Sequence, residues 1–138
     1  MLSDPLDATD FAINHYHLET GERFSGGLHA HLDQEEVFYV ISGTATFETR
    51  EEPLGETRTV DVGPDEAVRF APGEYQTGAN EGVEPVEALA FGAPTGSSEM
   101  RVPGPCGDCG AESLELDFGA GQHRRRCLDC GTETDLNV

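Results

Sequence analysis

Four cysteines near the C-terminus constrain the fold of this chain more than any other feature of its sequence. They form two Cys-x-x-Cys pairs separated by residues 110–126, namely Cys106 with Cys109 and Cys127 with Cys130. Two such pairs at this separation are typical of a zinc site, because four thiolates complete a tetrahedral coordination shell. A glycine directly follows each pair and allows backbone N–H groups to approach the sulfur atoms. The pattern predicts a small module that folds around zinc.

Zinc bound by four sulfurs has no open coordination position, so its predicted role is structural and not catalytic. The alternatives are two disulfides, which need an oxidising compartment, or a redox dithiol, which needs only one of the pairs. The region resembles a zinc ribbon, and the resemblance implies a β-hairpin between the two pairs. We expect residues 114–118 to form its first strand and residues 119–121 to form its turn.

The composition of the chain changes near Ala93, where strand-like sequence gives way to a stretch rich in proline, glycine and serine. Such a stretch is typical of a linker. The sequence therefore predicts a barrel over residues 1–94, a linker over residues 95–105 and a zinc ribbon over residues 106–138.

Within residues 1–94, short apolar runs alternate with turns that contain glycine or proline, and no stretch of helical period carries signals for both caps. This pattern predicts an all-β fold with strands spaced as in a sandwich or barrel. We expect strands at residues 12–19, 22–25, 28–31, 36–42, 44–50, 57–62, 67–71 and 85–92. Residues 37–41 are apolar on both faces of their strand, which predicts a homodimer through the barrel sheet.

The charge of the chain is extreme, with 27 acidic residues against 8 basic ones, a formal net charge of −19 and no lysine. Molar salt relieves the repulsion between such charges, because it shortens the Debye length to about 3 Å. Neither a signal peptide nor a long apolar membrane span is visible. We therefore expect a protein of the cytoplasm of an extreme halophile. Apolar runs at residues 37–41 and 86–91 argue against a disordered acidic chain.

The same charge argues against nucleic-acid partners, which require clustered lysine and arginine. The one basic cluster, Arg124–Arg126, directly precedes the second cysteine pair. We interpret it as neutralising the charge of the thiolate site and nearby acids. A contact with phosphate or nucleic acid is the alternative.

Two histidines, His29 and His31, stand one residue apart in a predicted strand and therefore point to the same face. A carboxylate from the next strand would complete a two-nitrogen, one-oxygen ligand set, which suits divalent transition metals and leaves coordination positions open. The alternative is a pair of core histidines whose nitrogens are bonded to backbone groups. His15 and His17 form a second such pair without a carboxylate at a useful spacing, and we expect them at a surface or an interface.

Residues 29–43 resemble the first motif of the cupin superfamily, in which His-x-His precedes a glutamate and, farther on, a glycine. By this resemblance His29, His31 and Glu36 would be metal ligands. Glu36 is preferred over Glu35 because its spacing to Gly43 matches the motif. The resemblance covers residues 15–93 and implies a small single barrel, a double-stranded β-helix of the jelly-roll type, with a ligand cavity inside.

The second motif of that superfamily is matched less fully. Its glycine, proline and asparagine positions look similar to Gly63, Pro72, Gly73 and Asn80, but the expected histidine is missing. Gln76 stands in its place, and a glutamine carbonyl oxygen is a neutral and weaker metal ligand than imidazole.

The resemblance implies a protein that binds or converts a small polar molecule at the barrel metal, for which iron, manganese, nickel and zinc all remain open. If the protein is an enzyme, it would be a metal-dependent oxygenase, isomerase or lyase, with Glu74, Tyr75 and Gln76 as candidate acid or base groups. The alternative is a non-catalytic ligand-sensing or regulatory module whose zinc ribbon contacts a macromolecular partner.

Overall fold

The computed structural model describes residues 2–117 and 123–135, and all of its regular elements are strands. Their bounds are β1 (Ala12–Leu18), β2 (Ala30–His31), β3 (Glu35–Ser42), β4 (Ala45–Arg50), β5 (Arg58–Val62), β6 (Ala67–Phe70), β7 (Tyr75–Ala79), β8 (Val86–Ala93), β9 (Met100–Pro103), β10 (Ser113–Asp117), β11 (Arg124–Arg126) and β12 (Glu133–Asp135). The all-β prediction is therefore confirmed. Within the described residues, no helix is long and apolar enough to span a membrane.

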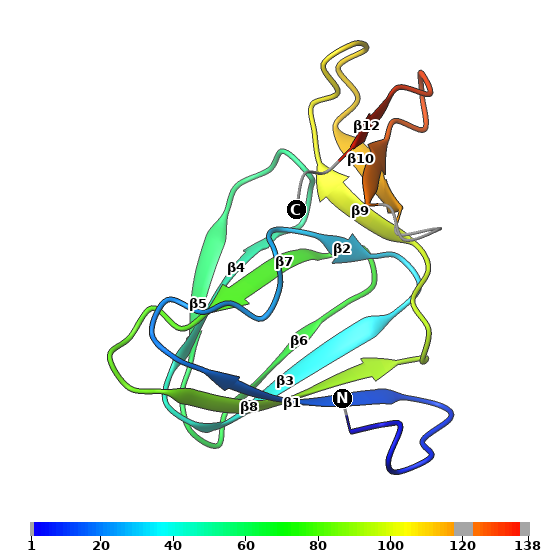
Figure 1. The fold of residues 1–138 in the computed structure, drawn as a ribbon. Coiled ribbons are helices and arrows are strands. Elements are labelled where there is room, and N and C mark those ends of the chain that lie inside the picture. The colour runs from blue at the N-terminus through cyan, green and yellow to red at the C-terminus, as the bar shows by residue number, and fades with distance from the viewer. Residues whose placement is uncertain (1, 118–122, 136–138) are drawn as a thin grey trace.

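Two antiparallel sheets form the barrel, one in the order β1-β8-β3-β6 and the other in the order β5-β4-β7 (Figure 1). Strand β8 shows why the chain adopts this arrangement, because its residues alternate between buried and half-buried along the whole strand. The buried side chains of both sheets meet in one apolar core: Leu18, Phe38, Val40, Ala45, Phe47, Val62, Phe70, Val86, Ala88 and Ala90.

Phenylalanine rings fill the centre of this core. Phe47 lies 5.0 Å from Phe38 and 5.5 Å from Phe24 between ring centroids, and the Phe24 and Phe47 rings are stacked. A Cβ atom at Gly78 would collide with both of these stacked rings. Glycine in the middle of β7 therefore makes room for the aromatic core.

Three features of the barrel differ from the sequence prediction. The strand expected at residues 22–25 is wrong, because Arg23 makes only an isolated bridge to Ala79 while Phe24 turns its ring into the core. Strand β7 was missed, since all five of its residues are buried and show no alternation. Strand β9 was also missed, because it lies within the residues expected to form a linker.

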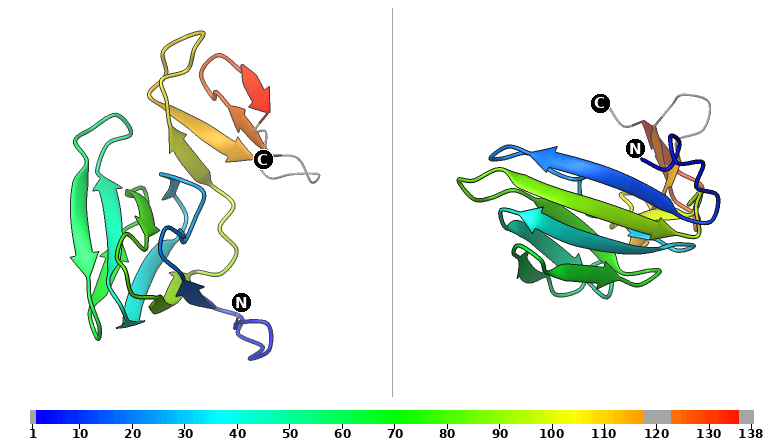
Figure 2. Two further views of the ribbon diagram at one scale, coloured as in Figure 1. Left: turned by 60° about the vertical axis from the view of Figure 1, so that its left-hand side comes forward. Right: turned by 90° about the horizontal axis from the view of Figure 1, so that it is seen from below.

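The last four strands share a sheet with one strand of the barrel. We call residues 95–117 and 123–135 the tail. Its strands form a sheet in the order β12-β11-β10-β9-β2, so the barrel strand β2 is the edge of the tail sheet. Figures 1 and 2 show the tail, mostly yellow to red, at one end of the barrel beside β2. Strands β10 and β11 pair antiparallel, whereas Phe118 and the turn expected at residues 119–121 lie outside the described residues.

Candidate metal centre

The predicted barrel ligands come from two neighbouring segments. His29 directly precedes β2, His31 lies in β2, and Glu36 lies in β3. One nitrogen from each imidazole and one oxygen of Glu36 lie within 4.8 Å of one another. His29 is buried and the other two side chains are half-buried, so the group faces a sheltered part of the barrel. The structure therefore brings together the three residues that the sequence singled out.

Hydrogen bonding determines which nitrogen of His29 is available. Its Nδ1 lies 2.8 Å from the carbonyl oxygen of Gly27. Because a carbonyl oxygen only accepts, Nδ1 carries the proton and Nε2 keeps its lone pair. Burial lowers the pKa of His29, which favours the neutral imidazole that a metal requires.

His31 contacts Glu36 directly, with its Nε2 2.6 Å from a carboxylate oxygen. Its Nδ1 lies 2.9 Å from the hydroxyl oxygen of Ser97. The His29 and His31 rings meet edge to face at a centroid distance of 5.0 Å. Two imidazole nitrogens and one carboxylate oxygen directed at a common point form the ligand set that divalent transition metals prefer.

Gln76 lies beside these ligands. It forms an isolated bridge with His29 through the backbone, and its side-chain nitrogen lies 3.4 Å from His29 Nε2. Its side chain is buried. A half-turn of the amide would bring the carbonyl oxygen to the same position, so Gln76 is placed to donate to His29 or to face a metal.

The other two candidate acid or base groups have partners elsewhere. Glu74 accepts hydrogen bonds from the backbone of Ala71 and the hydroxyl of Thr49, so it stabilises the turn before β7. Tyr75 is buried and hydrogen-bonds to Ser113 of the tail. Of the three candidates, Gln76 is the one that contacts a predicted metal ligand, His29, among the described residues.

Tyr16 is a functional candidate that the sequence analysis missed. It lies on β1 between His15 and His17, and it packs edge to face on Phe24 at 5.1 Å. Burial and the nearby charge of Glu36 raise its pKa above the ordinary value for tyrosine. A protonated phenol near the carboxylate is suited to donate a hydrogen bond to a bound molecule. No spacing pattern marks it, because its neighbour Glu36 belongs to another strand.

His15 and His17 lie on the exposed side of β1, as expected. Strand β8 supplies a carboxylate that the sequence analysis had not found: the two oxygens of Glu87 lie 3.4 Å from His15 Nε2 and 3.4 Å from His17 Nδ1. Glu19 adds a third contact, 2.9 Å from His17 Nε2. These exposed ion pairs raise the pKa of His17, chiefly through Glu19.

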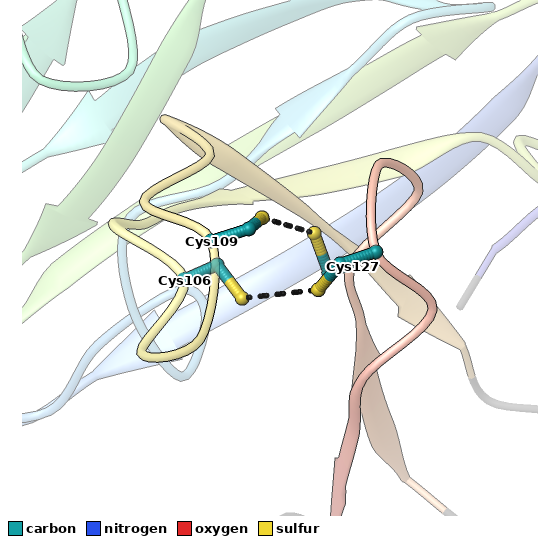
Figure 3. A group of neighbouring side chains, drawn as sticks. Cys106, Cys109 and Cys127 are labelled. Atoms are coloured by element: carbon teal, nitrogen blue, oxygen red, sulfur yellow. Dashed lines mark hydrogen bonds between the residues drawn. The ribbon is translucent and has the colours of Figure 1, made fainter.

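The four cysteines converge in the tail, and Figure 3 shows Cys106, Cys109 and Cys127 with their side chains directed toward one another. The sulfur of Cys106 lies 3.8 Å from that of Cys130, and the sulfur of Cys109 lies 3.5 Å from that of Cys127. These distances are far longer than a disulfide bond, and all four cysteines are free. The glycine after each pair has a positive φ and closes the turn with an N–H donated to the first cysteine's carbonyl. The two turns thus bring together four sulfur atoms that could hold one metal ion.

Residues 14–92 match the family described as Cupin domain. A structure with a double-stranded β-helix domain from Klebsiella pneumoniae is 20% identical, with 68% of this chain and 70% of that chain covered and a TM-score of 0.54. A putative sugar phosphate isomerase from Acidithiobacillus ferrooxidans is 18% identical, with 99% and 76% covered and a TM-score of 0.62.

The third similar structure is a variant of oxalate decarboxylase from Bacillus subtilis, 22% identical, with 67% of this chain and 24% of that chain covered and a TM-score of 0.58. The chain therefore spans about a quarter of that enzyme. At these identities the likeness establishes the shared fold. No curated protein matches the chain.

Proposed function

This chain belongs to the cupin family, and on that premise we propose that its barrel binds one divalent transition metal through His29, His31 and Glu36 and presents it to a small polar molecule. The convergence of the two imidazoles and the carboxylate carries this proposal. Three protein ligands leave coordination positions for a molecule whose carbonyl or carboxylate oxygen the metal would polarise.

If the protein is an enzyme, we propose that it is a metal-dependent oxygenase, isomerase or lyase. Two of the similar structures are described as an oxalate decarboxylase and a putative sugar phosphate isomerase, which supports a small polar substrate. We propose Tyr16 and Gln76 as residues that contact it, because the charge of Glu36 reaches Tyr16 and the Gln76 amide lies 3.4 Å from His29 Nε2.

A non-catalytic regulatory module is the second candidate. Two observations favour it: the neutral Gln76 replaces an imidazole beside the ligands, and the ligand strand β2 is also an edge of the tail sheet. A ligand bound in the barrel would then act on a macromolecule through the tail.

Elemental analysis of protein purified in high salt tests the barrel site. We expect two metal equivalents per wild-type chain, at least one of them zinc, and a single zinc equivalent in a variant that combines His29→Ala and His31→Ala. The matched control combines His15→Ala and His17→Ala, which removes the same atoms from the exposed pair and is expected to keep both metals. A single zinc equivalent in the wild type would contradict the proposed function.

For the tail we propose a structural zinc held by Cys106, Cys109, Cys127 and Cys130 in a ribbon over residues 106–138. The arginines support the structural interpretation, because Arg126 pairs with Glu115 and Arg124 pairs with Glu133 and Asp135. Arginines that already pair with carboxylates contribute little to phosphate binding.

We further propose a homodimer through the outer face of the β1-β8-β3-β6 sheet. Four side chains that point away from the core on β3 and β8 are apolar or aromatic and lie opposite one another, Val37 with Phe91 and Tyr39 with Leu89, while the charged Glu35 and Glu87 lie toward the two ends of this stripe. Nearby Ile41 is exposed. A second copy would cover this stripe.

Finally, we propose that the protein works in the cytoplasm of an extreme halophile, on the basis of its net charge of −19. Lowering KCl from about 1 M to about 0.01 M lengthens the Debye length from about 3 Å to about 30 Å. Repulsion then rises, and we expect the melting temperature to fall by about 10 °C or more. Differential scanning calorimetry measures the melting temperature. Sucrose added in low salt is the control, because it stabilises folded proteins in general without screening charges. An unchanged melting temperature would contradict the halophilic assignment.

A further inference from the structure

The tail reaches the barrel metal ligands through β9. This strand pairs with β10 of the tail on one side and with β2 on the other, where Ala30 lies opposite Arg101 and His31 opposite Met100. The strand that carries a metal ligand is therefore held between the barrel and the tail.

The segment just before β9 is fastened to the barrel by one carboxylate. Asp33, two residues after His31, accepts four hydrogen bonds from residues 97–99, two from side chains and two from backbone N–H groups. The shortest, at 2.7 Å, comes from the hydroxyl of Ser97. A further backbone bond of 2.8 Å runs from Leu32 to Glu99. With four donors on its two oxygens, the Asp33 carboxylate acts as an acceptor throughout.

These bonds determine the proton position on His31. Because the Ser97 hydroxyl donates its only proton to Asp33, its oxygen is an acceptor toward His31 Nδ1, which lies 2.9 Å away. His31 Nδ1 is therefore the donor toward Ser97, and this contact directs the opposite ring nitrogen, Nε2, at Glu36 2.6 Å away. His29 is also a donor at Nδ1, but to a carbonyl oxygen of its own loop. One metal ligand is thus oriented by the barrel and the other by the tail.

We propose that Ser97, oriented by Asp33, is a positioning residue for His31, so that the tail completes the barrel metal centre. This inference rests on the proposed metal-binding function of the barrel. An outer partner that holds a ligating histidine in one tautomer typically changes metal affinity by about 10-fold to 100-fold.

Titration of the zinc-loaded, full-length protein with Mn²⁺ tests the proposal, with free Mn²⁺ measured by electron paramagnetic resonance. Mn²⁺ prefers nitrogen and oxygen ligands and leaves zinc on the thiolates. We expect Ser97→Ala to weaken Mn²⁺ binding by about 10-fold to 100-fold. Ser97→Thr keeps the hydroxyl and is expected to restore binding. Ser98→Ala is the matched control, because the Ser98 hydroxyl bonds to the same Asp33 carboxylate, whereas the hydroxyl that contacts His31 belongs to Ser97.

A second readout is independent of the metal. Imidazole ¹⁵N spectra of the barrel-metal-free protein are expected to show a hydrogen-bonded proton at His31 Nδ1 in the wild type and, in Ser97→Ala, a shift toward the tautomer with its proton on Nε2, which faces Glu36. His29 is expected to be unchanged. Wild-type protein that binds no Mn²⁺ would contradict the proposed function itself. Normal wild-type binding that is equally tight in Ser97→Ala would overturn this inference alone, as would an unchanged His31 spectrum.

Discussion

Replacing Cys127 by serine is expected to release the zinc of the tail and to unfold β10, β11 and β12. In the described part of the tail, Cys106 and Cys127 are the buried hydrophobic residues. Little apolar packing therefore remains to hold these strands once the metal is lost. Structural zinc sites contribute on the order of 10 kcal/mol to folding. Zinc content by elemental analysis and amide hydrogen exchange measure the two effects together, with rapid exchange expected in these strands and protection retained in β8.

Leu128→Ala is the control for this substitution. Leu128 lies next to Cys127 in the same knuckle, but its side chain is exposed, so its removal is expected to leave zinc and exchange rates unchanged. If Cys127→Ser keeps both its zinc and the protection of β10, the tail does not depend on the four-sulfur site and the proposed ribbon is wrong.

Replacing Gly43 by alanine is expected to destabilise the barrel by about 2–5 kcal/mol. Gly43 has a φ of +76°, where a side chain is strained, and an added Cβ would collide with the carbonyl oxygen of Pro85. The same atom would lie 3.0 Å from the Cα of Val86, a core residue that is fully buried. Neither neighbour is the flexible end of a side chain, so the backbone has to move. Denaturant unfolding in high salt measures the loss of free energy.

Gly21→Ala separates the cost of the positive φ from the cost of the collision. Gly21 has a similar φ of +86°, but nothing lies within 4 Å of an added Cβ. It therefore carries the conformational cost alone, about 1 kcal/mol. Equal losses in the two variants would show that the contact with Pro85 and Val86 is relieved at no cost.

The geometry around Gly43 explains why a glycine stands at this position of the cupin-type motif. The glycine of the motif closes the turn between β3 and β4, where a backbone from β8 approaches closely. The His-x-His spacing placed both imidazoles on one face, and Glu36 followed on the next strand. The shared face of the two imidazoles is a local consequence of strand geometry, whereas Glu36 was chosen over Glu35 by resemblance to the cupin motif, in which the glutamate has this spacing to the glycine.

Local sequence patterns failed to predict a strand whose residues do not alternate between apolar and polar. All five residues of β7 are buried, and one of them is a glycine that admits two phenylalanine rings, so neither alternation nor composition marks it as a strand. β9 follows a stretch of proline, glycine and serine and becomes a strand because β2 and β10 lie on either side of it. The residues expected to be a linker thus include a structural element.

The sequence by itself determined the all-β barrel through its strand periodicity, and the convergence of four cysteines and the shared face of His29 and His31 through their spacings. Glu36 was chosen by resemblance to the cupin motif. Only the tertiary structure decided that Tyr16 lies near Glu36, that Glu74 and Tyr75 have other partners, and that Ser97 reaches His31. Ser97 and His31 are 66 positions apart along the chain. A contact of that kind depends on which strands pair, and local sequence patterns carry no information on pairing between distant segments.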